Sequence, residues 1–185
     1  MKRSSSFFIS LLTALFLGLS GCVGYMRGSA VAKELRTVHL PAFENGTEYP
    51  MAGAIATQQF ADALIEDGTF QLSTFEKARV RVQGTITGIN TRAVRYDRNH
   101  AIVLEEYHLT LVAKFSAYDA ESGETLIEDR SVSGATSMLT RGDFQTGVTD
   151  ALPRAARALA QNLLTELQSI ESPSEKERSE RKNEH

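Results

Sequence analysis

The feature that most constrains the fold is a long stretch in which apolar and polar residues alternate with a period of two. Val80, Val82 and Ile86 alternate with polar residues, the pattern extends through INTRAVRYD, and residues 106–117 repeat it. Such alternation is typical of strands that are buried on one face. The turn sequence DAESGE and the segment TLIEDRSVSGAT then predict a third strand. Three consecutive strands with short loops predict a long antiparallel meander. Gly84 and Gly88 interrupt the first strand and indicate a bulge or close packing.

Two segments have helical periodicity instead. In residues 51–67 the apolar positions recur at helical spacing, and Gly68 is the expected C-cap. Asp150 is the expected N-cap of the second helix, which puts Pro153 in the first turn, where its missing N–H has no intrahelical partner to lose. Residues 143–149 then form either a separate turn or a kinked extension. The apolar stripe of the second helix consists of Val148, Leu152, Ala155, Leu159, Leu163 and Leu167.

Two short strands complete the predicted fold. Residues 35–40 alternate between apolar and polar character. Pro41 is expected either to end their regular pairing or to put the strand at a sheet edge, because proline has no N–H to donate. TFQLST predicts another strand directly after the first helix. The order β-α-β-β-β-β-α predicts an α+β two-layer sandwich, with one mixed sheet and two amphipathic helices on one face. The other face is expected to be polar and open to a partner.

The N-terminus has the layout of a bacterial export signal. Lys2 and Arg3 precede an apolar run of about 13 residues, which is shorter than the roughly 20 that a membrane-spanning helix needs. Leu19-Ser20-Gly21-Cys22 resembles the lipobox of bacterial lipoproteins, in which the signal is cut before the cysteine and the cysteine is acylated. Cys22 is the only cysteine of the chain. The alternative is an ordinary export signal with a chance cysteine.

These signals divide the chain into four parts. We expect a lipoprotein signal peptide at 1–21, a tether at 22–35, an α/β domain at 36–170 and a disordered charged tail at 171–185. Stable anchoring needs more than one acyl chain, and the lipoprotein class supplies several. The residue after Cys22 is Val23 rather than Asp. In enteric-type sorting this favours the outer membrane, with the domain facing the periplasm.

No catalytic or metal-binding pattern is found in the sequence. His39, His100, His108 and His185 form no ligand pair, and neither a nucleophile elbow nor a P-loop occurs. The formal net charge is −3, and removal of Lys2 and Arg3 changes it to −5. This acidic balance gives no electrostatic footprint for nucleic acid. We therefore expect neither an enzyme nor a cofactor.

One basic cluster is the candidate binding site. Arg92, Arg95, Arg98 and His100 gather at the first hairpin, with Arg79 and Arg81 on the same strand. Because a guanidinium binds phosphate through two parallel hydrogen bonds, the cluster predicts a site for an anionic group such as a lipid head group. The alternative is a solvated hairpin without a ligand.

Several phrases of the sequence together resemble one family. GCVGY, RTVHLPAFENGTEYP, ARVRVQGTITG and YHLTLVAKFSAYDAESGETLIEDRSVSG occur in the order found in the LPS-assembly lipoproteins (LptE-like), over roughly residues 21–168. The resemblance implies a sheet with two helices on one side. It also implies a lipoprotein that plugs an outer-membrane β-barrel of the LptD type and assists the delivery of lipopolysaccharide. The alternative is a periplasmic lipoprotein that regulates cell-wall synthesis or builds a secretion pore.

Overall fold

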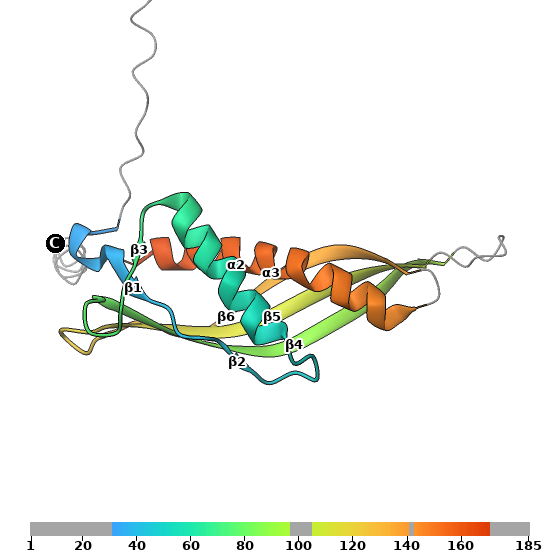
Figure 1. The fold of residues 1–185 in the computed structure, drawn as a ribbon, viewed down its shortest axis with the longest axis horizontal. Helices are drawn as coiled ribbons and strands as arrows, with labels where there is room; N and C mark the ends of the chain where they lie inside the picture. The colour runs from blue at the N-terminus through green and yellow to red at the C-terminus, as the bar shows by residue number, and fades with distance from the viewer. Residues whose placement is uncertain (1–30, 97–104, 141–142, 171–185) are drawn as a thin grey trace, which may run out of the picture.

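One six-stranded sheet and two α-helices make up the core of the described chain (Figure 1). The computed structural model describes residues 31–96, 105–140 and 143–170, so Cys22, Arg98, His100 and the predicted tail lie outside the described residues. Both helices lie on the same side of the sheet (Figure 1), which confirms the predicted two-layer α+β sandwich. In chain order the elements are η2 (Lys33–Arg36), β1 (Thr37–His39), β2 (Glu44–Asn45), α2 (Ala52–Asp67), β3 (Gln71–Leu72), β4 (Val80–Tyr96), β5 (Glu105–Asp119), β6 (Thr125–Thr140) and α3 (Phe144–Gln168).

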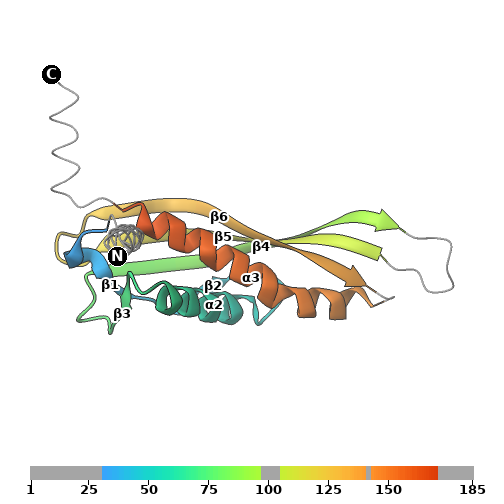
Figure 2. The same cartoon turned by 90° about the horizontal axis from the view of Figure 1, so that it is seen from above.

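The strands β4, β5 and β6 form the predicted antiparallel meander. Val82 lies opposite Ala117, and Leu111 lies opposite Gly134. The strands β1 and β2 both pair with β4 in parallel, and β3 pairs with β1 in parallel. The sheet is therefore mixed, in the order β3-β1-β4-β5-β6 with β2 also beside β4. The far ends of β4 and β5 extend beyond the start of α3 (Figure 2).

Pro41 divides what would otherwise be one continuous strand. The pairing is His39 with Arg81 in β1 and Glu44 with Thr85 in β2, so the chain between them carries one residue more than β4 does. Proline cannot donate to a ladder, and the extra residue lets the chain bulge past this position. The prediction that Pro41 ends regular pairing is confirmed.

Gly84 and Gly88 of β4 have different structural roles. One allows close packing and the other marks a bulge, the two roles that the sequence predicted. A Cβ on Gly84 would lie 2.7 Å from ring atoms of Phe43, so the missing side chain makes room for that ring. Phe43 is buried, its ring centroid lies 6.0 Å from that of Phe60, and its N–H donates to Thr57 Oγ1 of α2. Gly88 follows a shift in the β4–β5 register and marks a β-bulge.

The helix α2 ends as the sequence predicts. Gly68 adopts a left-handed conformation with φ of 72°, and its N–H donates to the carbonyl oxygen of Leu64. Glycine has no Cβ, so it adopts this conformation without a steric clash. Phe60 and Leu64 are fully buried and pack the helix into the core that it shares with α3.

The predicted N-cap of α3 is wrong, but of the two alternatives for residues 143–149 the structure shows the extension of the helix. The N-cap is Asp143 rather than Asp150, and its carboxylate accepts hydrogen bonds from the N–H groups of Gln145 and Thr146. Pro153 therefore lies inside the helix rather than in its first turn. An interior proline removes one backbone hydrogen bond and costs ~3 kcal/mol. The apolar stripe predicted for this helix is buried along its whole length.

Packing of the extra turns offsets the cost of the interior proline. Gly147, Val148 and Ala151 are buried, and the ring of Phe144 meets that of Tyr107 edge-on at 5.2 Å. Burying a large apolar side chain contributes about 1.5–3 kcal/mol, so the contacts of the first turns compensate for Pro153. Within the described residues, no helix is long and apolar enough to cross a membrane.

The packed domain starts before residue 36, where the sequence suggested that it begins. Val31 and Leu35 are each only 2% exposed and belong to the core. The guanidinium of Arg36 donates two hydrogen bonds to the carbonyl oxygen of Val31, at 3.3 and 3.2 Å. The segment from Val31 to Leu35 is therefore part of the domain and not of a free tether.

Candidate functional site

The face of the meander opposite the helices is rich in hydroxyl and amide side chains. Successive residues of a strand point to opposite faces, so the buried Leu109, Leu111 and Ala113 fix the helix side of β5. Thr110 and Lys114 consequently point to the other side, which we call the open face. The β4–β5 and β5–β6 registers place these further residues on the open face: Gln83, Thr85, Arg92, His108, Ser131, Ser133 and Ser137.

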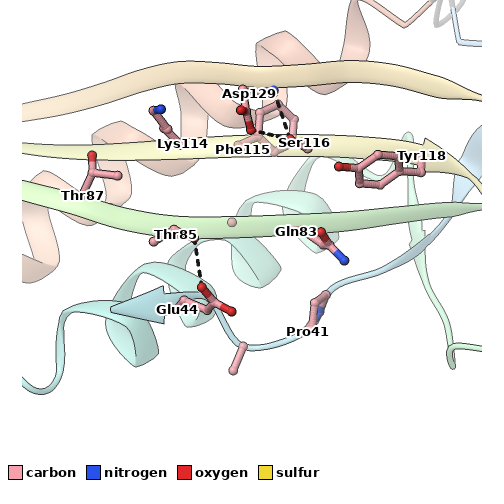
Figure 3. Close-up of a pocket in the computed structure, with 12 residues that line it drawn as sticks. Pro41, Glu44, Gln83, Thr85, Thr87, Lys114, Phe115, Ser116, Tyr118 and Asp129 are labelled. Atoms are coloured by element: carbon pink, nitrogen blue, oxygen red, sulfur yellow. Dashed lines mark hydrogen bonds between the residues drawn. The ribbon is translucent and has the colours of Figure 1, made fainter. Parts of the chain in front are cut away.

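A hollow of about 500 Å³ lies on the open face over β4 and β5 (Figure 3). Pro41 and Glu44 form one rim of the hollow, and Asp129 contributes to the other (Figure 3). Ala42 also lines the hollow. The Thr85 hydroxyl donates to the Glu44 carboxylate at 3.4 Å and ties β2 to the floor. The other lining residues are Gln83, Gly84, Thr87, Lys114, Phe115, Ser116 and Tyr118.

An irregularity between β5 and β6 places Asp129 at this rim. The register shifts between Phe115 and Ala117, which leaves Ser116 opposite an extra residue of β6. The Ser116 hydroxyl accepts from the Asp129 N–H at 3.0 Å and donates to its carboxylate at 3.4 Å. Asp129 has a φ of 40°, which is uncommon for a residue other than glycine. The bulge therefore fixes a carboxylate at the side of the hollow.

The chemistry of the hollow suits a polar ligand without strong net charge. Lys114 supplies one ammonium group, and Glu44 and Asp129 supply two carboxylates. The remaining polar lining consists of hydroxyl and amide groups, which hydrogen-bond sugar hydroxyls as both donors and acceptors. Among the described residues, no group of three or more His, Cys, Asp or Glu is placed to hold a metal ion.

The predicted basic cluster is described only in part. Arg92 is exposed and lies opposite His108 in the ladder, on the open face near the far end of β4. The backbone of Arg95 pairs with Glu106. Arg98 and His100 lie outside the described residues, so the cluster stays a prediction.

Arg79 and Arg81 do not join that cluster. Arg81 lies near the opposite end of β4 and Arg79 just before it, about 36 and 43 Å along the chain from Arg92 at ~3.3 Å per residue. The Arg81 guanidinium carbon lies 3.7 Å from the ring centroid of Phe75, in a cation–π contact. Arg79 forms ion pairs with Asp119 and with an exposed glutamate of the β5–β6 turn. Both guanidinium groups therefore have partners within the fold, and the expectation that they extend the basic end is wrong.

Asp119 is the most buried charged group in the described chain. Its carboxylate receives two hydrogen bonds from Arg79, at 2.6 and 2.9 Å, and others from the N–H groups of Glu121 and Ser122. Burial by itself raises the pKa of Asp119, but these hydrogen bonds and the Arg79 charge outweigh it and hold the pKa below its ordinary value near 3.8. This network organises the turn, in which Gly123 has a φ of 72°.

No pattern in the sequence predicts the hollow. Its rim comes from residues 41–44 and Asp129, which are far apart in the chain and meet only through strand register. The available signal was Gly84 within a strand of alternating hydroxyl and apolar residues. That glycine indicates close approach of another segment, but not which one.

Comparison with known proteins gives a family match and a set of similar folds. A family model described as lipopolysaccharide-assembly, LptE, matches residues 35–167. A protein of Chlamydia trachomatis has a similar fold, with a TM-score of 0.50, 7% identity, and 72% of this chain and 96% of that chain covered. PelC of Paraburkholderia phytofirmans, solved as a dodecamer, is 20% identical with a TM-score of 0.45, covering 77% of this chain and 96% of that one.

A further solved structure is named as a lipoprotein. The rare lipoprotein B of Shewanella oneidensis is 11% identical with a TM-score of 0.40, and the match covers 80% of this chain and 99% of that one. No curated protein matches this chain. At 7% identity the Chlamydia trachomatis structure shows a similar fold and nothing about function, whereas the family match spans nearly the whole described domain.

Proposed function

Because the chain belongs to the LptE family of lipopolysaccharide-assembly lipoproteins, we propose that it plugs and supports a lipopolysaccharide-translocating β-barrel of the LptD type in the outer membrane. The family's part in lipopolysaccharide assembly is non-enzymatic. In this proposal the protein assists the delivery of lipopolysaccharide to the cell surface by occupying a position within the barrel. A role in regulating cell-wall synthesis or building a secretion pore is the alternative.

The observation that carries the proposal is the polar open face of the sheet. Two helices cover one face of the sheet, and hydroxyl, amide and charged groups line the other. The lumen of a large outer-membrane barrel is polar, because lipid-facing and lumen-facing residues alternate along its strands. A polar sheet face is therefore matched to a lumen wall and would be out of place against lipid.

The dimensions of the domain set a minimum size for the barrel. Five strands side by side at ~4.8 Å span about 24 Å, and a helix layer adds on the order of 10 Å in the other direction. Barrels of 16–18 strands leave a water channel, whereas those of about 22 strands hold a plug domain. We therefore expect a partner of about 22 strands or more.

The lipid anchor completes the proposal. Acylation of Cys22 would hold the domain at the periplasmic side of the outer membrane. Val31 already belongs to the packed domain, so only eight residues separate it from Cys22, a connection of ~30 Å at most when fully extended. This short connection keeps the domain next to the membrane in which its partner barrel lies.

For lipopolysaccharide itself we propose two contacts. Arg92, Arg95, Arg98 and His100 would bind its phosphate groups, because guanidinium groups pair well with phosphate. The hollow beside Lys114 would bind uncharged sugar hydroxyls, because its own charges are mixed.

The barrel partner is tested by co-expression. The tagged lipoprotein is expressed with the LptD-type barrel of the same genome and purified in detergent, and we expect a stable one-to-one complex. A chain with Phe144→Asp, which places a charge against the partly buried Tyr107 at the margin of the core, is the control for folding-dependent capture. Recovery of a penicillin-binding protein or of a secretion pore in place of the barrel would support the alternative.

The phosphate contact is tested by charge removal. Replacing Arg92, Arg95 and Arg98 by Gln should weaken binding of purified lipopolysaccharide several-fold at fixed ionic strength. Arg157→Gln is the matched control, because Arg157 is exposed on α3 and contacts Gln59 instead. Equal binding by the triple variant and the control would refute this site.

A further inference from the structure

The outer edge of β4 is paired along only part of its length. β1 pairs with β4 at Val80 and Arg81, and β2 pairs with it at Thr85 and Ile86. Beyond this point no described strand lies on the outer side of β4. The ladder to β5 meanwhile continues without a break from Gly88 to Ala93, between two bulges. A regular six-residue strand segment therefore has one side of its backbone unpaired within the described structure.

The ladder shows which backbone groups of this segment point outward. The carbonyl of Ile86 accepts from the Gly46 N–H on the outer side, so Ala113 opposite it turns its backbone toward β6. Every second residue of β5 does the same, down to Leu109 and Tyr107. The residues of β4 opposite those positions therefore point their N–H and C=O groups outward, and they are Ile89, Thr91 and Ala93.

The other edge of the meander, on β6, has carbonyl groups that accept hydrogen bonds from side chains. On β6 the outward carbonyl of Ser133 accepts from the Asn162 side chain of α3 at 2.7 Å, and that of Ser137 accepts from Arg154 at 3.3 Å. Side chains of α3 thus occupy carbonyl groups along the β6 edge, which discourages pairing with another strand. No described side chain does this for Ile89, Thr91 or Ala93.

A second hollow lies where β2 ends and the open edge of β4 begins. It has a volume of about 230 Å³ and is bounded by residues 46–49 on one side and by residues 87–90 of β4 on the other. An extended strand that continued the line of β2 would enter here. The hollow is large enough to receive one of its side chains.

We propose that an extended segment of the barrel partner adds to the sheet as a new strand along Gly88–Ala93. Backbone hydrogen bonds to Ile89, Thr91 and Ala93 would hold the segment, as in other cases of strand addition. Arg92 is exposed on the open face beside this edge. Its guanidinium has five N–H donors, so it can pair with a carboxylate of the added segment and still contact a phosphate of lipopolysaccharide. We therefore expect the segment to carry a carboxylate opposite Arg92. This inference rests on the proposed function, because it names the barrel as the source of the strand.

A second copy of this chain is the less suitable occupant. Antiparallel self-pairing about Thr91 would bring the two copies of Arg92 to diagonal positions, about 7–8 Å apart, where like charges repel. A carboxylate-bearing strand turns the same geometry into an attraction. Charge therefore favours a different polypeptide.

The experiment uses a proline that removes one outward N–H and leaves the β4–β5 ladder intact. Thr91→Pro is compatible with an edge strand, because the lost donor points away from β5. Thr91→Val is the matched control, since it keeps the N–H and the β-branched shape. Each variant is co-expressed with the LptD-type barrel, and the dissociation constant of the purified complex is measured. We expect Thr91→Pro to weaken the complex on the order of tenfold and Thr91→Val to leave it unchanged.

Hydrogen exchange of the wild-type complex gives an independent readout. Amides of residues 88–93 should be protected in the complex relative to the free lipoprotein, whether or not the proline variant folds. A wild-type complex that forms without this protection, or that Thr91→Pro binds equally well, overturns the strand addition and leaves the plug function standing. Absence of any wild-type complex overturns both. Conversion of an oligomer to a monomer by Thr91→Pro without the barrel would assign the edge to self-association and also overturn the proposal.

Discussion

The backbone of α3 lies directly on β6 at Gly134, and this contact allows a quantitative prediction. A Cβ built on Gly134 would lie 2.6 Å from Leu159 Cα and closer still to Leu159 N and Ala155 O. Carbon atoms in normal contact are ~3.5–4.0 Å apart, so Gly134→Ala requires α3 to move about 1 Å or more from the sheet. The obstacles are backbone atoms, which cannot rotate aside as a flexible side chain would.

The cost follows from what that movement disrupts. Overpacking of a filled core costs about 1–3 kcal/mol, and displacement of a helix also loosens its buried stripe. We therefore expect Gly134→Ala to lower the free energy of unfolding by ~3 kcal/mol. At roughly 2–4 °C per kcal/mol for a chain of this size, the Tm should fall by about 6–12 °C. Urea denaturation followed by circular dichroism measures the first quantity, and a thermal scan measures the second.

Gly88→Ala is the matched control for this substitution. It makes the same chemical change in the same sheet, but its Cβ would meet only Asn90 Nδ2, at an ordinary 3.8 Å. Its stability should stay within ~0.5–1 kcal/mol of the wild type, because the loss of chain entropy in the unfolded state offsets small strains. If Gly134→Ala proved as stable as Gly88→Ala, the direct contact between α3 and β6 would be refuted.

Three further predictions concern single charged or modified groups. Asp119→Asn should lower the free energy of unfolding by roughly 2–3 kcal/mol, because it leaves Arg79 without its buried partner. The pKa of Asp119 is lowered in the folded state, so its stabilisation is present above about pH 3.8 and is lost as the pH falls further. The urea midpoints of wild type and variant should therefore converge in acid. Asp143→Ala should destabilise the fold, because α3 loses its N-cap. Hydrogen bonds from Thr146 and Gln145 lower the pKa of Asp143, so the difference in urea midpoint between variant and wild type should shrink as the pH falls below about 3.8, and a constant difference would argue against the cap. Cys22→Ala should release the protein from the membrane fraction, and its retention there after a salt wash would contradict lipid anchoring.

The parts of the fold that could be predicted from sequence are those whose signal is local. The meander follows from period-two alternation on each strand, and the end of α2 follows from Gly68. The start of α3 could not be predicted, because Asp143 and Asp150 are equally good caps in isolation. The ring of Phe144 on Tyr107 selects the earlier one, and that contact joins residues far apart in the chain.

The same distinction separates the successful and failed parts of the site prediction. An open polar face could be predicted from alternation alone. The partners of Arg79 and Arg81 could not, because Asp119 and Phe75 reach them only through strand pairing and a loop. Charges counted along the sequence therefore overstated the basic character of one end of β4. The hollow beside Asp129 depends on a bulge, which no periodic pattern reveals.

The two edges of the meander differ in whether side chains cover their backbone groups, and this difference supports the proposal that the protein binds a strand of a partner. Exposed strand edges promote aggregation, and proteins commonly cover or charge them. Here α3 covers the β6 edge with Asn162 and Arg154, while the β4 edge beyond Ile86 keeps a regular ladder without such cover in the described structure. A domain that bound no other strand would be better protected from aggregation if both strand edges were covered. One regular edge left open next to a polar face is the arrangement that the proposed strand addition requires.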